Sequence, residues 1–356
     1  MILFVTTRRS SLDNERRCRQ FRNLGMAWRH ISLSDEAFPE VFDSLRRRRL
    51  WARLGAIWRG IFRLRAEIRR LSPSDILYVN ALDCLAAVLL ARMGIARHNK
   101  LICQILDVHS LLLYPGPYRR LLRWIERRLL GAIDLLVVPS AGALPRYFRP
   151  VAGYRGPAAV VNNRLPSGEA EEPCPAPPFN GTWIIGWFGS LRCERSVKIL
   201  CHAAAILGQK VEIRIAGTSK LPAGLLEQAI APLSNITYLG PFAAMDTGRL
   251  YRDVHFSWAV HFESPIKAQW ALPVRTFEGG AHGRPALVRA DTDAGTHMHD
   301  NGIGWGIAEP LEQELPLFLQ SLTERDYRKV AANVCEKRQL FVGEEQLAQA
   351  IAQIRS

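Results

Sequence analysis

The chain has 356 residues, of which 48% are hydrophobic, and its net charge is +14. This length suits two domains of about 150 residues, each with its own core. Its seven Cys residues are scattered and include no C-x-x-C pair, which argues against a disulfide framework and favours the reduced thiols of a cytosolic protein. No window of about 18 consecutive apolar residues is present, so we expect no bilayer-spanning helix.

The first half of the chain alternates apolar strands with helical segments, which predicts a parallel, doubly wound sheet. Met1 to Val5 is a short apolar run closed by Thr6 and Thr7, typical of a first strand and not of a secretory signal. We expect strands over residues 2–6, 75–79, 100–106 and 134–139, and helices over residues 13–24, 45–71, 83–94 and 117–131.

Positive charge is concentrated in this half. Residues 1–160 contain 28 Lys and Arg against 12 Asp and Glu, a net of +16, which leaves 19 against 21, a net of −2, for the other 196 residues. Such an asymmetry indicates that one half meets an anionic partner, whether a membrane, a nucleic acid or a phosphorylated acceptor.

The strongest helical pattern of this half lies between Arg46 and Leu71, where apolar residues recur at alternating spacings of four and three. Ten Arg and one Glu lie between Arg46 and Arg70. An aromatic and apolar stripe beside a dense Arg face is typical of a helix at a membrane interface, although the same stripe also suits a helix that covers the sheet. We expect part of the stripe to be core and the Arg cluster to touch anionic lipid. The predicted membrane contacts are Arg46, Arg47, Arg48, Arg49, Trp51 and Trp58, and the patch could extend to Arg119, Arg120, Arg123, Arg127 and Arg128.

Two polar groups follow predicted strands in this half. His109 comes shortly after the strand at 100–106, where the carboxyl ends of parallel strands form the ligand-binding edge. A buried, hydrogen-bonded structural histidine is the alternative interpretation. Asp83 follows the strand at 75–79. We interpret it as a helix N-cap rather than as a carboxylate that faces the cleft.

A Pro-rich and acidic stretch over residues 165–181 has the composition of a linker, and strand–helix alternation restarts after it. Strands are expected over residues 183–188, 211–216, 236–239, 255–260 and 286–289, with helices over residues 196–207, 222–231 and 273–283. Both halves are therefore predicted to be doubly wound α/β domains.

The restart carries a first motif, in which a strand ends at Gly189 and a helix begins near Arg195. Gly189 allows the backbone to approach a ligand closely. Three cations, Arg192, Arg195 and Lys198, surround this opening. A solvated helix start with incidental Arg residues is the alternative.

The second motif is Pro273 to Pro285, which reads P-x-R-x-x-E-x-x-x-x-G-x-P. Pro273 can open a helix, and Arg275 and Glu278 then share one face of its first turns. This helix start favours anions, and the pair could hold a phosphate and a ribose diol. An ordinary surface salt bridge is the alternative.

Together these motifs resemble the donor site of GT-B glycosyltransferases, and in particular the group 1, family 4-like enzymes of bacterial exopolysaccharide synthesis. In that resemblance Glu278 matches the glutamate that holds the nucleotide ribose and Arg275 the accompanying cation. Gly189, Leu191, Glu194 and Arg195 match the G-R-L-x-x-E-K-G element, whose basic residues neutralise the donor diphosphate. The chain departs from the family at several positions: Ser190 replaces an Arg, Ser196 a Gly, Gly279 a Tyr, and Trp270 a Glu that contacts the donor sugar.

The resemblance implies a GT-B fold of two Rossmann-like domains. We expect an acceptor-side, membrane-facing domain over residues 1–164, a linker over 165–181, a nucleotide-sugar domain over 182–340, and a C-terminal helix over 341–356 that packs back on the first domain. It also implies His109 as the catalytic residue near the donor sugar. The implied donor residues are Gly189, Ser190, Arg192, Arg195, Lys198, Arg275 and Glu278.

The predicted activity is transfer of a hexose from a nucleotide diphosphate sugar, most simply a UDP-sugar, to a lipid-linked or polysaccharide acceptor. We expect this to occur at the cytoplasmic face of the membrane, with the anionic membrane surface as a partner and without a cofactor or a metal. A nucleotide-sugar epimerase or a non-catalytic nucleotide-sugar binder of the same fold is the alternative. The basic half suggests a third class, nucleic-acid binding, but it carries no recognised binding motif, so we expect no nucleic-acid partner.

Overall fold

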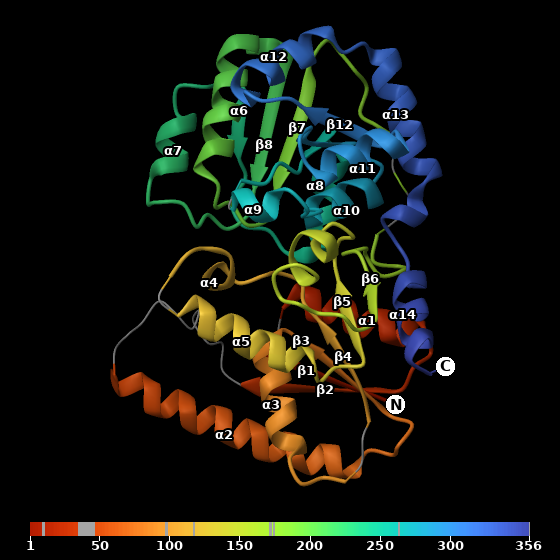
Figure 1. Ribbon diagram of the computed structural model, residues 1–356. Helices are drawn as coiled ribbons and strands as arrows, with labels where there is room; N and C mark the ends of the chain where they lie inside the picture. Colours follow the sequence, from red (N-terminus) through yellow and green to blue (C-terminus); the bar gives the residue numbers. More distant parts are fainter. Residues whose placement is uncertain are drawn as a thin grey trace. The chain divides into compact units, whose positions relative to one another are not determined.

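The computed structural model describes residues 1–8, 11–34, 47–96, 99–116, 118–170, 173, 175–262 and 264–355, with the backbone alone for residues 47–58 and 244. The chain divides into two compact units, residues 1–162 with 344–356, and residues 163–343. Each unit contains one sheet of six parallel strands (Figure 1). The predicted α/β, doubly wound fold is therefore confirmed.

The first sheet has the strand order β2-β1-β3-β4-β5-β6. Its strands are β1 (Ile2–Arg8), β2 (Trp28–Ser34), β3 (Ile76–Asn80), β4 (Lys100–Gln104), β5 (Leu135–Val138) and β6 (Ala158–Val160). The helices of this unit are α1 (Leu12–Asn23), α2 (Arg47–Arg70), α3 (Leu82–Arg92), α4 (Ser110–Leu113), α5 (Arg119–Leu130) and α14 (Glu345–Arg355), with one π-helical turn at Leu144–Phe148.

Helices cover both faces of this sheet because alternate strand residues point to opposite sides. Phe4, Tyr78 and Ile102 pack in one cluster with Phe21 of α1 and with Leu347 and neighbouring residues of α14. The C-terminal helix thus lies against the sheet of the N-terminal unit. On the other face, α2 packs on α3, and α3 in turn contacts α5.

The second sheet has the strand order β12-β11-β10-β7-β8-β9. Its strands are β7 (Trp183–Phe188), β8 (Val211–Ala216), β9 (Ile236–Tyr238), β10 (Phe256–Trp258), β11 (Ala286–Arg289) and β12 (Gly304–Ile307). The helices are α6 (Glu194–Leu207), α7 (Leu225–Ile230), α8 (Thr247–Arg252), α9 (Pro265–Ala268), α10 (Val274–Ala281), α11 (Asp293–Asn301), α12 (Leu311–Ser321) and α13 (Glu324–Glu336), with short 3-10 turns at Gly208–Lys210, Ala244–Asp246 and Arg338–Leu340.

The segment predicted to be a linker belongs to this second unit. Leu165 and Ala170 are buried with Phe341 in a core cluster, and Leu165 exchanges backbone hydrogen bonds with Phe341 and Gly343. Further along, the carbonyl oxygen of Pro175 accepts a hydrogen bond of 3.0 Å from the buried Arg284 side chain. This Pro-rich segment is therefore extended and packs on the second unit.

Helix α10 lies unusually close to its neighbours because two adjacent glycines face them. A Cβ atom on Gly279 would lie 2.5 Å from Cβ of Ser257 in β10, and one on Gly280 would lie 2.2 Å from the ring of Phe341. Glycine at 279, where the resemblance expects a tyrosine, is therefore a requirement of this packing. Because α10 packs this closely on β10, the backbone of Arg275 and Glu278 has a fixed position relative to the sheet.

We predict that Gly280→Ala lowers the free energy of unfolding by about 1–3 kcal/mol, because the added methyl group overpacks a rigid aromatic neighbour. Gly116→Ala is the matched control, since a Cβ there would meet no atom within 4 Å, and it should change stability by less than about 0.5 kcal/mol. Denaturant unfolding of both variants measures the difference. Equal stabilities would contradict the packing described for α10.

Candidate donor site

The strand order of the second sheet reverses between β7 and β10: β8 and β9 follow β7 on one side, and β11 and β12 follow β10 on the other. Strands β7 and β10 are hydrogen-bonded neighbours although they are far apart in sequence. In open parallel sheets, ligands bind beyond the carboxyl ends of the strands at such a reversal. The loop that leaves β7 begins at Gly189, and α10 packs beside β10 and β11. Both predicted motifs therefore belong to this edge of the sheet.

Three glycines at the ends of neighbouring strands let their loops pack backbone against backbone. Gly189, Gly217 and Gly240 have φ angles of +106°, +138° and +76°, which other residues rarely adopt. A Cβ atom on Gly217 would lie only 1.7 Å from the carbonyl oxygen of Gly189. The Gly189 amide donates to the carbonyl of Ala216 at 2.9 Å, and the Gly217 amide to that of Gly240 at 2.8 Å. The result is a loop edge with little side-chain bulk.

Arg275 ties helix α10 to the loop after β7. Its Nε donates to the carbonyl oxygen of Phe188 and its Nη2 to that of Ser190, both at 2.5 Å. The guanidinium also lies 5.9 Å from the ring centroid of Trp187. The hydroxyl of Ser257 in β10 donates a hydrogen bond of 3.0 Å to the carbonyl oxygen of Arg275, which holds the helix against the sheet. The cation that the motif assigned to a diphosphate thus positions the glycine loop.

Glu278 is half-buried, one helical turn after Arg275 on α10. Two buried hydroxyl oxygens near this pair, Oγ of Ser190 and Oγ1 of Thr276, have no hydrogen-bond partner among the described residues. A buried hydroxyl without a partner costs about 1–3 kcal/mol, and such groups in a native structure call for an explanation such as an absent ligand. They lie on the two elements that Arg275 joins.

The other predicted cations are placed differently. Arg195, in the first turn of α6, forms ion pairs with Glu309 at 2.6 Å and Glu312 at 3.1 Å, and its guanidinium lies 4.5 Å from the ring centroid of Phe262. The hydrogen bond to Glu312, followed by that to Glu309, raises the pKa of Arg195. Arg192 and Lys198 are exposed. The structure therefore joins Gly189, Ser190 and Arg275, and directs Arg195 to two carboxylates.

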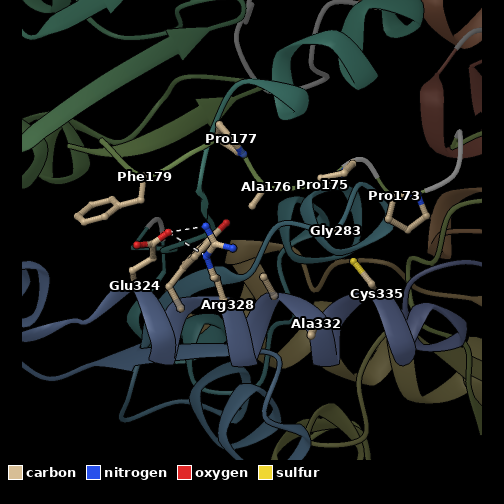
Figure 2. Close-up of a pocket in the computed structure, with 12 residues that line it drawn as sticks. Pro173, Pro175, Ala176, Pro177, Phe179, Gly283, Glu324, Arg328, Ala332 and Cys335 are labelled. Atoms are coloured by element: carbon tan, nitrogen blue, oxygen red, sulfur yellow. Dashed lines mark hydrogen bonds and ion pairs between the residues drawn. The ribbon is translucent and has the colours of Figure 1, made fainter. Parts of the chain in front are cut away.

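A cavity of about 390 Å³ lies elsewhere in this unit, between α13 and the segment that includes Pro175 and Phe179 (Figure 2). Its charged lining residues, Glu324 and Arg328, pair with each other at 2.6 Å. A second cavity, of about 430 Å³, lies next to the carboxyl ends of β7 and β8. It is lined by Phe188 and Ala216, which end β7 and β8, by residues 239–242 after β9, and by residues of α8.

The sequence analysis missed this second cavity. Its size falls within the range of small-molecule sites, roughly 300–1,000 Å³. The signal that could have found it is the Gly240-Pro241 pair, which follows a strand at the ligand-binding edge of the sheet.

In the N-terminal unit, His109 is exposed and caps helix α4, accepting a hydrogen bond of 3.2 Å at Nδ1 from the amide of Leu111. A neutral ring in this position carries its proton on Nε2 and can donate it. The alternative of a buried structural histidine is wrong, although His109 has a local capping role.

The reversal of the first sheet lies between β1 and β3. There the hydroxyl of Thr7 donates to Oδ2 of Asp83 at 2.7 Å. The N-cap interpretation of Asp83 is wrong, because Ala81 occupies that position. Ala81 has φ +81° and ψ 161°, a region that is nearly restricted to glycine and is strained for other residues.

The predicted membrane contacts fall mainly outside the described side chains. Arg46 is outside the described residues, and for Arg47, Arg48, Arg49, Trp51 and Trp58 only the backbone, helical in α2, is described. Further along the same helix, Ile61, Leu64 and Ile68 are buried. The expectation that part of the stripe is core is confirmed for this stretch.

No protein-family model matches the chain. It is 27% identical over 294 residues to the succinoglycan biosynthesis protein ExoL of Rhizobium meliloti, covering 79% of this chain and 72% of the relative. Its structure resembles sucrose-phosphate synthase from Thermosynechococcus elongatus, with a TM-score of 0.73 at 13% identity and coverage of 99% and 98%.

Two further solved structures cover 99% of this chain. They are Anabaena HepE in complex with UDP and glucose, with a TM-score of 0.69, 15% identity and 100% of its length covered, and the lipopolysaccharide outer core galactosyltransferase WaaB, with a TM-score of 0.62, 13% identity and 99% covered. These comparisons confirm the GT-B fold and the resemblance to proteins of exopolysaccharide synthesis.

We predict that His109→Asn and His109→Ala both lose activity by about 10²- to 10³-fold, the range for removal of a hydrogen-bond donor that acts in the transition state. Asparagine is a good N-cap and alanine is not, so only the alanine variant should also lose stability, by about 1 kcal/mol. Turnover assays and thermal unfolding separate the two effects. Full activity of His109→Asn would show that His109 only caps α4.

Proposed function

We propose that this protein is a glycosyltransferase of exopolysaccharide synthesis that moves a hexose from a UDP-sugar to a lipid-linked or polysaccharide acceptor. The observation that carries the proposal is the glycine loop at the β7–β10 reversal, held by Arg275 beside Glu278. Its GT-B fold, its relative ExoL and the UDP and UDP-glucose complexes of a structural neighbour support it.

In this proposal the donor lies along the edge of the second sheet. Its diphosphate lies against the Gly189 loop, where the backbone can approach closely and where α6 begins with its positive dipole end. The exposed Arg192 adds a cation there. The ribose diol is held by the Glu278 carboxylate, and the base occupies the cavity of about 430 Å³ next to the ends of β7 and β8.

Transfer breaks the bond between the anomeric carbon and the diphosphate oxygen, and the acceptor oxygen forms the new bond to that carbon. The products are the glycosylated acceptor, UDP and one proton, which the acceptor hydroxyl releases to solvent. Negative charge then grows on the departing diphosphate, so groups aimed at it stabilise the transition state. The described residues contain no cluster of three or more His, Cys, Asp or Glu that could hold a metal ion. Among the described residues, Arg192 and the start of α6 lie at this loop and can serve this task.

His109 acts on the sugar side of the reaction in this proposal. Because Nδ1 accepts from the Leu111 amide, a neutral imidazole presents Nε2–H and can donate a hydrogen bond to a donor-sugar hydroxyl. This role is assigned from the resemblance and from the position of His109 after β4.

An epimerase or a non-catalytic nucleotide-sugar binder is the second candidate. Trp270, which replaces the sugar-contacting glutamate of the resembling family, favours it, because the side chain is 7% exposed and cannot replace a carboxylate. Incubation with a UDP-sugar and an acceptor distinguishes them: only a glycosyltransferase releases UDP in an acceptor-dependent manner.

We also propose that the enzyme works at the cytoplasmic face of the membrane. The net charge of +16 over residues 1–160 supports attachment of that part of the chain to an anionic surface. None of the described helices has the length and apolar content needed to cross a bilayer. Attachment in this proposal is therefore peripheral.

We predict that Glu278→Ala loses about 2–4 kcal/mol of transition-state binding, because it leaves the ribose hydroxyls without an acceptor. The measurement is kcat/KM for the UDP-sugar. Glu336→Ala, at an exposed position of α13, is the control and should behave as wild type. Turnover of Glu278→Ala within about threefold of wild type would rule out this role, given that each 1.4 kcal/mol is tenfold.

We predict that Arg275→Lys and Arg275→Ala weaken UDP binding to a similar extent, about tenfold or more, since one ammonium group cannot reproduce the two hydrogen bonds that position the loop. Arg192→Ala should weaken binding by removing a direct charge contact, and Arg192→Lys should restore much of it. Calorimetry with UDP measures all four. If Arg275→Lys binds UDP as tightly as wild type, the loop-positioning role is wrong.

A further inference from the structure

Helix α5 turns an apolar stripe toward solvent. Tyr118, Leu121, Trp124 and Ile125 are between 38% and 71% exposed, and their spacing of three and four places them on one side of the helix. The opposite side carries Glu126 and Leu130, which are buried in the unit. Large apolar side chains in a contiguous exposed patch mark an interaction site more often than a neutral surface.

Helix α4 enlarges this patch. Its residue Leu111 and the adjacent Tyr114 are exposed at 44% and 39%. Contacts between α4 and α5 hold the two helices together, and Nε of Arg123 donates to the carbonyl of Leu112 at 3.2 Å. We refer to Leu111, Tyr114, Tyr118, Leu121, Trp124 and Ile125 as the α4–α5 face; the two helices lie next to each other in Figure 1.

The charged residues of helix α5 are basic, with one exception. Helix α5 contains five arginines, at positions 119, 120, 123, 127 and 128. Its one acid, Glu126, points inward and accepts a hydrogen bond of 2.7 Å from the hydroxyl of Tyr147, and burial raises its pKa to about 7. The guanidinium of Arg128 lies 5.5 Å from the ring centroid of Trp124, so the cationic rim borders the apolar centre.

We propose that the α4–α5 face is the membrane-docking surface of this protein and inserts between the head groups of an anionic bilayer. Exposed apolar and aromatic residues next to arginines on one helix are the composition of helices that lie in a membrane interface. Protein interfaces are also enriched in aromatic residues and Arg, so the choice of partner rests on charge: the exposed charged side chains of α5 are all Arg, and each basic residue near an anionic leaflet strengthens membrane attachment. The observations therefore favour anionic lipid over a protein partner.

The position of the α4–α5 face also has a consequence for the acceptor, and this part of the inference rests on the proposed function. His109 is the N-cap of α4, so the proposed catalytic residue directly precedes the α4–α5 face in the chain. Docking through α4 and α5 would bring the head group of a lipid-linked acceptor to this edge of the N-terminal sheet. It also adds α5 as an attachment site to the Arg-rich segment at residues 46–58, whose side chains lie outside the described part of the chain.

The test is co-sedimentation of the full chain with vesicles of phosphatidylcholine alone and of phosphatidylcholine with phosphatidylglycerol. The variant Leu121→Gln/Trp124→Gln/Ile125→Gln should lose binding to the anionic vesicles by tenfold or more, and added salt should not restore it. The matched control is Ile206→Gln/Leu317→Gln, which alters two apolar side chains of the other unit exposed at 52% and 56%; it should bind as wild type. If the triple variant fails to fold, Leu121→Gln alone should weaken binding measurably.

Wild-type binding to anionic but not neutral vesicles, lost in the triple variant, supports the proposal. Equal binding of wild type and triple variant overturns it. A wild-type dimer that the triple variant makes monomeric, with no vesicle binding by either, also overturns it and assigns the face to a second copy. UDP binding, measured in parallel, distinguishes failure of the docking proposal from failure of the proposed function. A triple variant that binds UDP but not vesicles has lost only membrane docking. A wild type that binds vesicles but not UDP contradicts the donor site alone.

Discussion

The proposed donor-binding edge of the second sheet depends on one side chain that bridges two elements far apart in sequence. Arg275 leaves the first turn of α10 and donates to the carbonyls of Phe188 and Ser190, 87 and 85 residues away. Carbonyl oxygens at a glycine loop would otherwise need water or a ligand as partners. Since α10 also carries Glu278 and packs closely on β10 through Gly279, the same interaction fixes the loop, the helix and the carboxylate with respect to each other.

The two units divide the physical tasks of the proposed reaction. The second unit, which belongs to the part of the chain with a net charge of −2, builds its site from close-packed glycine loops, a helix start and a few cations. Arg195, held by Glu309 and Glu312, shows that not every cation near the donor loop is available to a diphosphate. The first unit carries the basic excess and the α4–α5 face, and so has the surface chemistry for an anionic bilayer.

The sequence predicted the fold where local signals were strong. Strands at residues 183–188, 211–216 and 286–289 have the predicted bounds, because uninterrupted apolar runs mark buried parallel strands. Strand β2 was missed because Trp28–Ser34 alternates polar residues at a sheet edge, and β12 because its short run contains two glycines. The long-range pairs of Arg275 and Arg195 leave no local pattern. On α5 only the arginines were noticed, since a stripe such as Leu121, Trp124 and Ile125 normally faces a core.

The most direct test of the donor site is hydrogen–deuterium exchange of the backbone amides with and without UDP. We predict that UDP slows exchange in residues 189–196, in residues 239–242 and at the start of α10, because the nucleotide covers the glycine loop, the cavity beside β7 and β8, and Glu278. Residues 225–230 of α7, which line no part of this edge, should be unaffected. Protection confined to residues 1–162, or none at all at saturating UDP, would contradict the central claim that this edge binds the donor nucleotide.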